Sequence, residues 1–165
     1  MITTNHVSLI MKICKAKDKD LPEILDLQYL AFQSEAEKFK NRDILPLKQT
    51  LDELRDELRN GVILKLVADN IIIGSVRANS KAGTTHIAKL MVHPDYRRRG
   101  FGKKLLAEIE KCFPKTRYEL FTATKSPDNI RLYEKMGYEI SHYKKINDEL
   151  VFAHMQKQPA SNGNI

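Results

Sequence analysis

The amino-acid sequence predicts a single α/β domain built on one mixed, mostly antiparallel sheet with helices on both faces. Its 165 residues suit one domain, residues 1–158, followed by a flexible tail at 159–165, and 42% apolar residues are enough for a core. Strand and helix patterns follow in the order β-α-α-β-β-β-α-β-α-β-β, without internal repeats. The strand, helix and strand over residues 84–123 require a right-handed parallel crossover at the centre, whereas the short connections elsewhere favour antiparallel pairs.

The N-terminal part of the chain begins with one strand and one helix. Residues 9–13 have the pattern of a short strand. A helix then begins at Asp20, with a proline and Glu23 in its first turn, and an apolar period continues to Ala31. Residues 32–46 are polar and mixed and show no clear period, so no regular element is expected there.

A second helix and three strands follow. Residues 50–53 form the capping-box pattern Thr-Leu-Asp-Glu, and Gly61 suits a left-handed cap at the end of that helix. Asp69 and Asn70 are a two-residue hairpin signal, and residues 81–83 form the next turn. The expected antiparallel strands are residues 62–68, 71–78 and 84–92.

The second half alternates helices and strands and ends in a hairpin. An apolar face runs from Phe101 to Phe113 and stops before Pro114, which indicates a helix. Ser126 and Gly137 are placed to cap and to close a shorter helix. The remaining expected elements are a strand at residues 117–123, the short helix at 129–136, and a last hairpin of residues 138–145 and 149–156.

The positive charge is concentrated in the second half. The sequence has 28 Lys and Arg against 21 Asp and Glu, a net charge of +7, and residues 1–60 hold 10 basic and 11 acidic residues. Residues 61–165 therefore supply the whole excess. An anionic partner such as a phosphorylated cofactor, a nucleic acid or an acidic surface would explain it, as would a solvated basic face. The densest basic segment contains Arg97, Arg98, Arg99, Lys103 and Lys104.

Several classes of protein are excluded. Apolar runs such as residues 71–73 are far shorter than the roughly 20 residues of a membrane-spanning helix. Polar residues 3–6 stand where a secretory signal would be apolar. Cys14 and Cys112 are too few for a disulfide framework and lack zinc-ligand spacing. We therefore expect buried free thiols, no metal, no membrane association and a reducing cytoplasmic location.

The most informative segment leaves a strand at Val92 and enters a helix by Leu105. Gly100 and Gly102 let the backbone bend and approach a ligand closely. The unpaired N–H groups and the dipole of the first helical turn favour an anion, and nearby arginines add charge-assisted contacts. A dinucleotide fingerprint would need a third glycine at Leu105, and a Walker A motif is absent. The segment predicts a diphosphate site, with ordinary turn chemistry as the alternative.

Two motifs together resemble those of the GNAT superfamily of N-acetyltransferases. One is Arg97-x-x-Gly100-x-Gly102 after a strand that ends with Leu-Met-Val-His-Pro, and the other is the segment 129–138, Asn-Ile-Arg-Leu-Tyr-Glu-Lys-Met-Gly-Tyr. The resemblance, over residues 9–156, implies acetyl-CoA as co-substrate. It implies loop amides on the pyrophosphate and a pantetheine arm along the preceding strand. The implied cofactor-binding residues are Leu90, Met91, Val92, Arg97, Arg98, Arg99, Gly100, Phe101, Gly102, Lys103, Asn129 and Tyr133.

Acetyl transfer to an amine sets chemical requirements of its own. A lysine-like amine with a pKa of about 10.4 is almost entirely protonated at neutral pH, so a proton acceptor is expected. His86 is the candidate because an unperturbed imidazole is mostly neutral at pH 7; a surface histidine or a water relay is the alternative. The resemblance places Tyr133 near the thioester sulfur, where its phenol would protonate the thiolate. A backbone N–H near Val92 would bind the thioester oxygen.

The expected activity is direct transfer of an acetyl group to a primary amine of a small molecule or peptide in a ternary complex. The alternatives are a catalytically silent CoA-binding regulatory module and, with less support, a basic nucleic-acid-binding domain. The resemblance places the acceptor against residues 32–46, where Glu35, Glu37 and Asp43 would attract a cationic amine or simply be solvated. Many relatives pair through sheet edges, so a homodimer is a further expectation.

Overall fold

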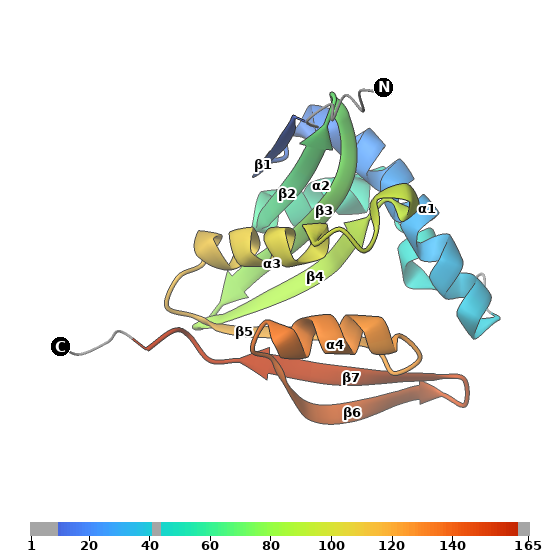
Figure 1. Ribbon diagram of the computed structural model, residues 1–165, viewed down its shortest axis with the longest axis vertical. Helices are drawn as coiled ribbons and strands as arrows, with labels where there is room; N and C mark the ends of the chain where they lie inside the picture. The colour runs from blue at the N-terminus through green and yellow to red at the C-terminus, as the bar shows by residue number, and fades with distance from the viewer. Residues whose placement is uncertain (1–9, 41–43, 162–165) are drawn as a thin grey trace, which may run out of the picture.

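The computed structural model describes residues 10–40 and 44–161, which form a seven-stranded sheet in the order β1-β2-β3-β4-β5-β7-β6. β4 and β5 are parallel, and all other neighbouring strands are antiparallel. α3 and α4 lie on one face of the sheet, and α1 and α2 lie on the other (Figure 1). The predicted mixed α/β fold with a central parallel crossover is confirmed.

The bounds of most elements agree with the sequence patterns. The strands are β1 (Met11–Lys15), β2 (Val62–Ala68), β3 (Ile71–Lys81), β4 (Thr84–Val92), β5 (Arg117–Ala123), β6 (Glu139–Asn147) and β7 (Leu150–Lys157). The helices are α1 (Leu21–Phe39), α2 (Leu51–Asn60), α3 (Phe101–Cys112) and α4 (Pro127–Lys135), with short 3₁₀ helices η1 (Asp18–Asp20), η2 (Leu45–Leu47) and η3 (Pro94–Tyr96). β1 begins later than expected because Met11–Lys15 is the segment that pairs with β2.

Each face of the sheet has its own hydrophobic core, because successive strand residues point to opposite sides. The cluster under α3 includes Leu66, Ile73, Leu105 and Ile109. The cluster under α1 and α2 includes Ile24, Leu54, Ile63 and Ile72. The central strands β2, β3 and β4 are therefore covered on both sides.

α1 differs from the sequence prediction at both ends. It continues past Ala31 to Phe39, through the segment in which no regular element was expected, because its C-terminal half is held by tertiary contacts described below. Glu23 does not cap the helix; its carboxylate accepts the Ile72 N–H at 3.0 Å and so joins α1 to β3. Asp20 instead accepts the Lys17 N–H at 2.8 Å and pairs with Lys65 at 2.9 Å.

The connections around α2 confirm two predictions and correct one. The capping box between Thr50 and Glu53 is present, and Asp69 and Asn70 both have positive φ, as a two-residue hairpin requires. Gly61 is not a left-handed cap, since its φ is −162°. A Cβ there would lie 2.3 Å from the Ala78 carbonyl oxygen, so glycine is required by the close approach of β3.

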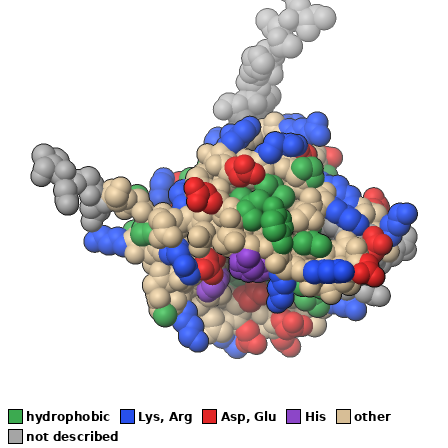
Figure 2. All heavy atoms as spheres, turned by 90° about the horizontal axis from the view of Figure 1, so that it is seen from below, with side chains coloured by type: hydrophobic (Ala, Val, Ile, Leu, Met, Phe, Trp, Pro, Cys, Tyr) green, Lys and Arg blue, Asp and Glu red, His purple; other side chains and the backbone are tan. Residues whose placement is uncertain are grey.

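The remaining features of the described chain concern its surface and thiols. No helix within residues 10–40 and 44–161 is long and apolar enough to cross a membrane. Cys14 and Cys112 are free thiols, but both are half-buried rather than buried. Seen from below, the surface combines hydrophobic, histidine and basic side chains (Figure 2). The predicted tail, residues 159–165, lies partly outside the described residues.

Candidate active site

β4 and β5 diverge after a short parallel ladder, and this divergence opens a cleft. The ladder joins residues 84–86 to residues 117–119 and ends there. Beyond it, the β4 edge that faces β5 has no strand partner among the described residues, so its backbone N–H and C=O groups are available to a ligand. The cleft has a volume of about 650 Å³ and lies between β4, the N-termini of α3 and α4, and the C-terminal half of α1.

Most of the residues predicted to bind the cofactor meet in this cleft. Of the predicted cofactor-binding residues, only Arg99 is not part of the cleft lining. The predicted base His86 is not part of the lining either. The sequence-predicted residues that line the cleft are Leu90, Met91, Val92, Arg97, Arg98, Gly100, Phe101, Gly102, Lys103, Asn129 and Tyr133. Residues from β4, the loop before α3, α3 and α4 are therefore brought together around the unpaired edge of β4.

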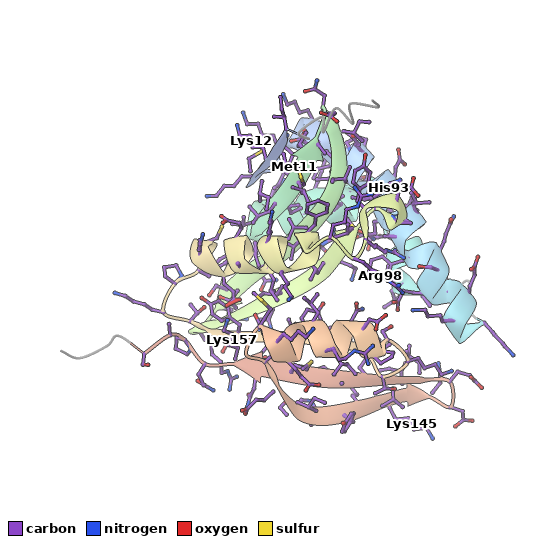
Figure 3. All side chains as sticks on the ribbon, viewed as in Figure 1. Met11, Lys12, His93, Arg98, Lys145 and Lys157 are labelled. Atoms are coloured by element: carbon purple, nitrogen blue, oxygen red, sulfur yellow. The ribbon has the colours of Figure 1, made fainter. Side chains whose placement is uncertain are left out.

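The backbone between η3 and α3 lines the end of the cleft at which the sequence predicts an anion. Arg98 has a φ of +64° and Gly100 a φ of +83°, and these left-handed residues turn the chain so that the first turn of α3 lines the cleft. A Cβ at Gly100 would meet nothing within 4 Å, so glycine is needed there for its φ and not for space. Arg98 and His93 lie at this end of β4, between α3 and α1 (Figure 3). The unpaired amides and the open space beside them fit a diphosphate.

Arg97 has a structural role that the motif does not reveal. Its guanidinium donates to the Val92 carbonyl at 3.3 Å, the Ala31 carbonyl at 3.2 Å and the Ser34 hydroxyl at 3.4 Å. Arg97 thus fastens α1 to the end of β4, and most of its donors are directed to the protein rather than to a ligand.

The other basic residues of the loop fall into two groups. Arg99 donates to the Asp95 carbonyl at 3.4 Å and lies 5.4 Å from the centre of the Tyr96 ring, outside the cleft lining. Arg98 and Lys103 line the cleft, and their side chains make no hydrogen bond or ion pair within the described residues. Within the described part of the chain, no ion pair neutralises these two charges at the cleft.

Tyr133 lies on α4 and is buried beside the cleft. Burial, and then the negative charge of Glu35, raise the pKa of its phenol above the ordinary value. The hydroxyl therefore keeps its proton at neutral pH and can act as a donor. Asn129, one turn earlier on the same helix, donates from its side-chain amide to the Thr122 hydroxyl at 3.3 Å, which holds α4 against β5.

Glu35 links α1 to the far side of the cleft. Its carboxylate accepts a hydrogen bond from the buried Ser126 hydroxyl at 3.0 Å, just before α4. Ser126 was expected to cap α4 with this hydroxyl; it makes no side-chain cap and is used for the tertiary contact instead. Of the other predicted acceptor-binding acids, Glu37 is exposed and outside the cleft lining, and Asp43 lies outside the described residues.

His86 is not brought to Tyr133. It occupies the last row at which β4 and β5 are still paired, opposite Glu119, and its side chain is 53% exposed. Its Nδ1 lies 3.5 Å from the Glu119 carboxylate. The neighbouring Ile87 belongs to the core under α3, so His86 is directed to the opposite face of the sheet.

The sequence patterns missed the wall that α1 contributes. The missed lining residues include Ala31, Phe32, Ser34 and Lys38 from α1, with Tyr96, Ser126 and Leu132 from other elements. A helical period continued through residues 32–39 was the one signal that could have suggested this wall. No local pattern indicates that the wall lies over β4.

Comparison with known proteins agrees with this geometry. Residues 31–159 match a family model described as an acetyltransferase (GNAT) domain. The catalytic subunit NAA20 of the N-terminal acetyltransferase B complex of Arabidopsis thaliana is 32% identical over 73 residues, so the match spans 42% of either protein.

Solved structures give the same fold. The PaiA N-acetyltransferase of Thermoplasma acidophilum, in complex with coenzyme A, has a TM-score of 0.77 at 18% identity over 90% of this chain and 99% of that one. The ribosomal-protein-S18-alanine N-acetyltransferase of Escherichia coli has a TM-score of 0.74 at 16% identity over 94% and 99%. With a family model that matches most of its length, the chain belongs to the GNAT acetyltransferase family.

Proposed function

We propose that the protein transfers the acetyl group of acetyl-CoA directly to a primary amine while both are bound. The position of Tyr133 carries this proposal: a phenol that keeps its proton lies in the same cleft as the unpaired edge of β4 and the first turn of α3. A proton donor for a leaving thiolate and a site for a diphosphate thus share one cavity.

Each wall of the cleft would bind a different part of the co-substrate. The amides of Phe101, Gly102 and Lys103 would bind the pyrophosphate, with the side chains of Arg98 and Lys103 adding charge. The unpaired edge of β4 would pair with the pantetheine arm, and its amide near Val92 would donate to the carbonyl oxygen. When bound, acetyl-CoA supplies a thioester that amines can attack.

On the amine side, we assign two roles. Glu35 attracts the ammonium form, since its carboxylate is among the groups that line the cleft. His86 accepts the proton through an intervening water, because it lies outside the cleft lining. Glu119, 3.5 Å from its Nδ1, would orient the ring.

No acetyl-enzyme is part of this proposal, because neither Cys14 nor Cys112 lines the cleft. The two free thiols support a reducing, cytoplasmic setting. Two of the similar proteins are named as an N-terminal acetyltransferase subunit and a ribosomal-protein-alanine acetyltransferase, which supports a peptide amine as one class of acceptor beside small amines.

The proposal is tested by release of free thiol from acetyl-CoA in the presence of a panel of primary amines. Lys103→Ala should raise the dissociation constant for acetyl-CoA about tenfold, in line with the loss of one charged hydrogen bond. Lys104→Ala is the matched control, because that neighbouring lysine does not line the cleft. Binding without turnover on any amine would indicate a silent CoA-binding module, and equal effects of both variants would place the phosphates elsewhere.

A further inference from the structure

Lys135 is a cation of the cleft that the predicted set of cofactor-binding residues does not include. It is the last residue of α4, its side chain is exposed, and it is part of the cleft lining. Within residues 10–40 and 44–161 its ammonium group makes no hydrogen bond or ion pair. The adjacent Glu134 is not part of the lining. An unpaired lysine at the wall of a cleft offers its charge to a bound anion.

Lys135 lies beside the first turn of α3, where the diphosphate is expected. A Cβ on Gly102 would lie 3.4 Å from the Cδ2 atom of Leu132, so α3 and α4 are in contact at this point. Lys135 comes three residues after Leu132, and residues three apart lie on the same side of a helix. Lys135 and the α3 turn can therefore contact neighbouring groups of one ligand.

The coenzyme can lie in the cleft in only one direction if its thioester faces Tyr133 and its diphosphate meets the first turn of α3. The nucleotide is attached to the other side of the diphosphate, so it continues outward to the rim, where the lining side chains are exposed. There coenzyme A carries a second kind of phosphate, on the 3′-oxygen of its ribose. This phosphomonoester has a charge of about −1.5 to −2 at neutral pH, which a cation at the rim would stabilise.

Four cations of the cleft lining keep their charges unpaired within the described part of the chain: Lys38, Arg98, Lys103 and Lys135. Arg98 and Lys103 flank the start of α3 and are assigned to the diphosphate. The two exposed lysines that remain for the 3′-phosphate come from α1 and α4. The N-terminal end of α4 lies toward α1 and its C-terminal end lies away from it (Figure 1), so these two lysines are at different parts of the rim.

The neighbouring charges favour Lys135 over Lys38. Glu35 lines the cleft one turn before Lys38 on the same side of α1, so the two charges offset each other for an approaching anion. On α4, the cleft-lining acid Asp128 already pairs with Arg131. The rim at α4 therefore presents a net positive charge, whereas the rim at α1 does not.

We propose that Lys135 binds the 3′-phosphate of the coenzyme, so that the rim of the cleft at the end of α4 is a phosphomonoester site separate from the diphosphate site. The protein then selects coenzyme A and acetyl-CoA over forms that lack this phosphate. This inference rests on the proposed acetyl transfer, because it uses the placement of acetyl-CoA given there.

The test combines a change in the ligand with a change in the protein. Calorimetric titration measures the dissociation constants of coenzyme A and 3′-dephospho-coenzyme A for the wild type and for Lys135→Ala. We expect the wild type to bind coenzyme A about fivefold more tightly than the dephospho form, the effect of one exposed ion pair. Lys135→Ala should lose this preference, while its dissociation constant for the dephospho form stays at the wild-type value.

Two further variants serve as controls. Lys135→Arg retains the charge and should keep the preference. Lys104→Ala removes an equal charge from the start of α3, but Lys104 is outside the cleft lining, so this variant should also keep the preference.

Equal weakening of both ligands by Lys135→Ala would place its charge at the diphosphate and overturn the inference. The absence of a preference in the wild type would overturn it, as would a preference that Lys135→Ala retains, and loss of that preference in Lys38→Ala would move the site to α1. In each of these cases thiol release from acetyl-CoA would still uphold acetyl transfer. Failure to bind either ligand would remove both proposals.

Discussion

At the scale of single residues, Tyr133 combines burial with access to a reactive cavity. Burial and the nearby charge of Glu35 both disfavour the phenolate, so the raised pKa makes this side chain a donor and not a base at neutral pH. Tyr138 offers a contrast in the same core: its ring centre is 6.0 Å from that of Tyr133, yet it does not line the cleft. Position, rather than burial, distinguishes the two phenols.

We expect Tyr133→Phe to lower kcat by about 10²-fold, the lower end of the range for acid and base groups. The affinity for acetyl-CoA should stay close to wild type, because the ring is retained. Steady-state kinetics and calorimetric titration measure the two quantities. Tyr138→Phe should leave kcat unchanged. A Tyr133→Phe enzyme with normal kcat and weakened acetyl-CoA binding would contradict the assignment and indicate a binding role.

At the scale of elements, Arg77 of β3 holds together the helices that wall the cleft. Its side chain is buried, and it donates to Gln28 of α1 at 2.9 Å and to Gln49, just before α2, at 2.7 Å. It also pairs with Glu57 of α2 at 2.5 Å. Burial lowers the pKa of Arg77 to about 10, so the charged guanidinium costs stability that these contacts offset.

Arg77→Ala should lower the free energy of unfolding by about 3 kcal/mol, because it leaves the buried side-chain oxygen of Gln28 without a donor and opens a space between α1, α2 and β3. Urea denaturation followed by circular dichroism measures the change. Arg59→Ala, which removes an exposed pair on the same helix α2, should leave stability nearly unchanged. Equal stability of the two variants would show that the buried network contributes nothing.

At the scale of the whole molecule, stability depends on a carboxylate at the start of α1. Burial alone would raise the pKa of Asp20, but hydrogen bonds from the Lys17 N–H and the Lys65 ammonium outweigh it, and the net pKa lies below the ordinary 3.8. A depressed folded-state pKa means that the charged form stabilises the fold above about pH 4. This contribution is lost as the pH falls through the folded-state pKa.

Asp20→Asn should therefore melt at a lower temperature than the wild type at pH 7. The difference should shrink as the pH is lowered below about 4, where the wild type also loses the charge. Differential scanning calorimetry over this pH range measures the effect. Asp26→Asn, at an exposed position on the same helix, is the control and should follow the wild type throughout. A constant difference at all pH values would contradict the linkage to Asp20.

The sequence predicts what local chemistry determines. Periodicity and turn residues predict the order of elements and the bounds of β4 and β5, and Gly100 predicts the left-handed bend of the loop before α3. Contacts between distant residues lie beyond such reasoning. The hydrogen bond from Ser126 to Glu35 joins residues 91 positions apart in the sequence. The hydrogen bond from Arg97 to the Ala31 carbonyl of α1 joins residues 66 positions apart. These two contacts hold Ala31 and Glu35 of α1 beside the cleft.

The same two contacts hold α1 across the gap between β4 and α4. Arg97 joins α1 to the end of β4, and Ser126 joins it to the start of α4. Because both contacts hold the same stretch of α1, Ala31 to Glu35, that helix cannot move away from the cleft without breaking hydrogen bonds on both sides of it. The cavity therefore keeps its α1 wall as long as the two contacts are made.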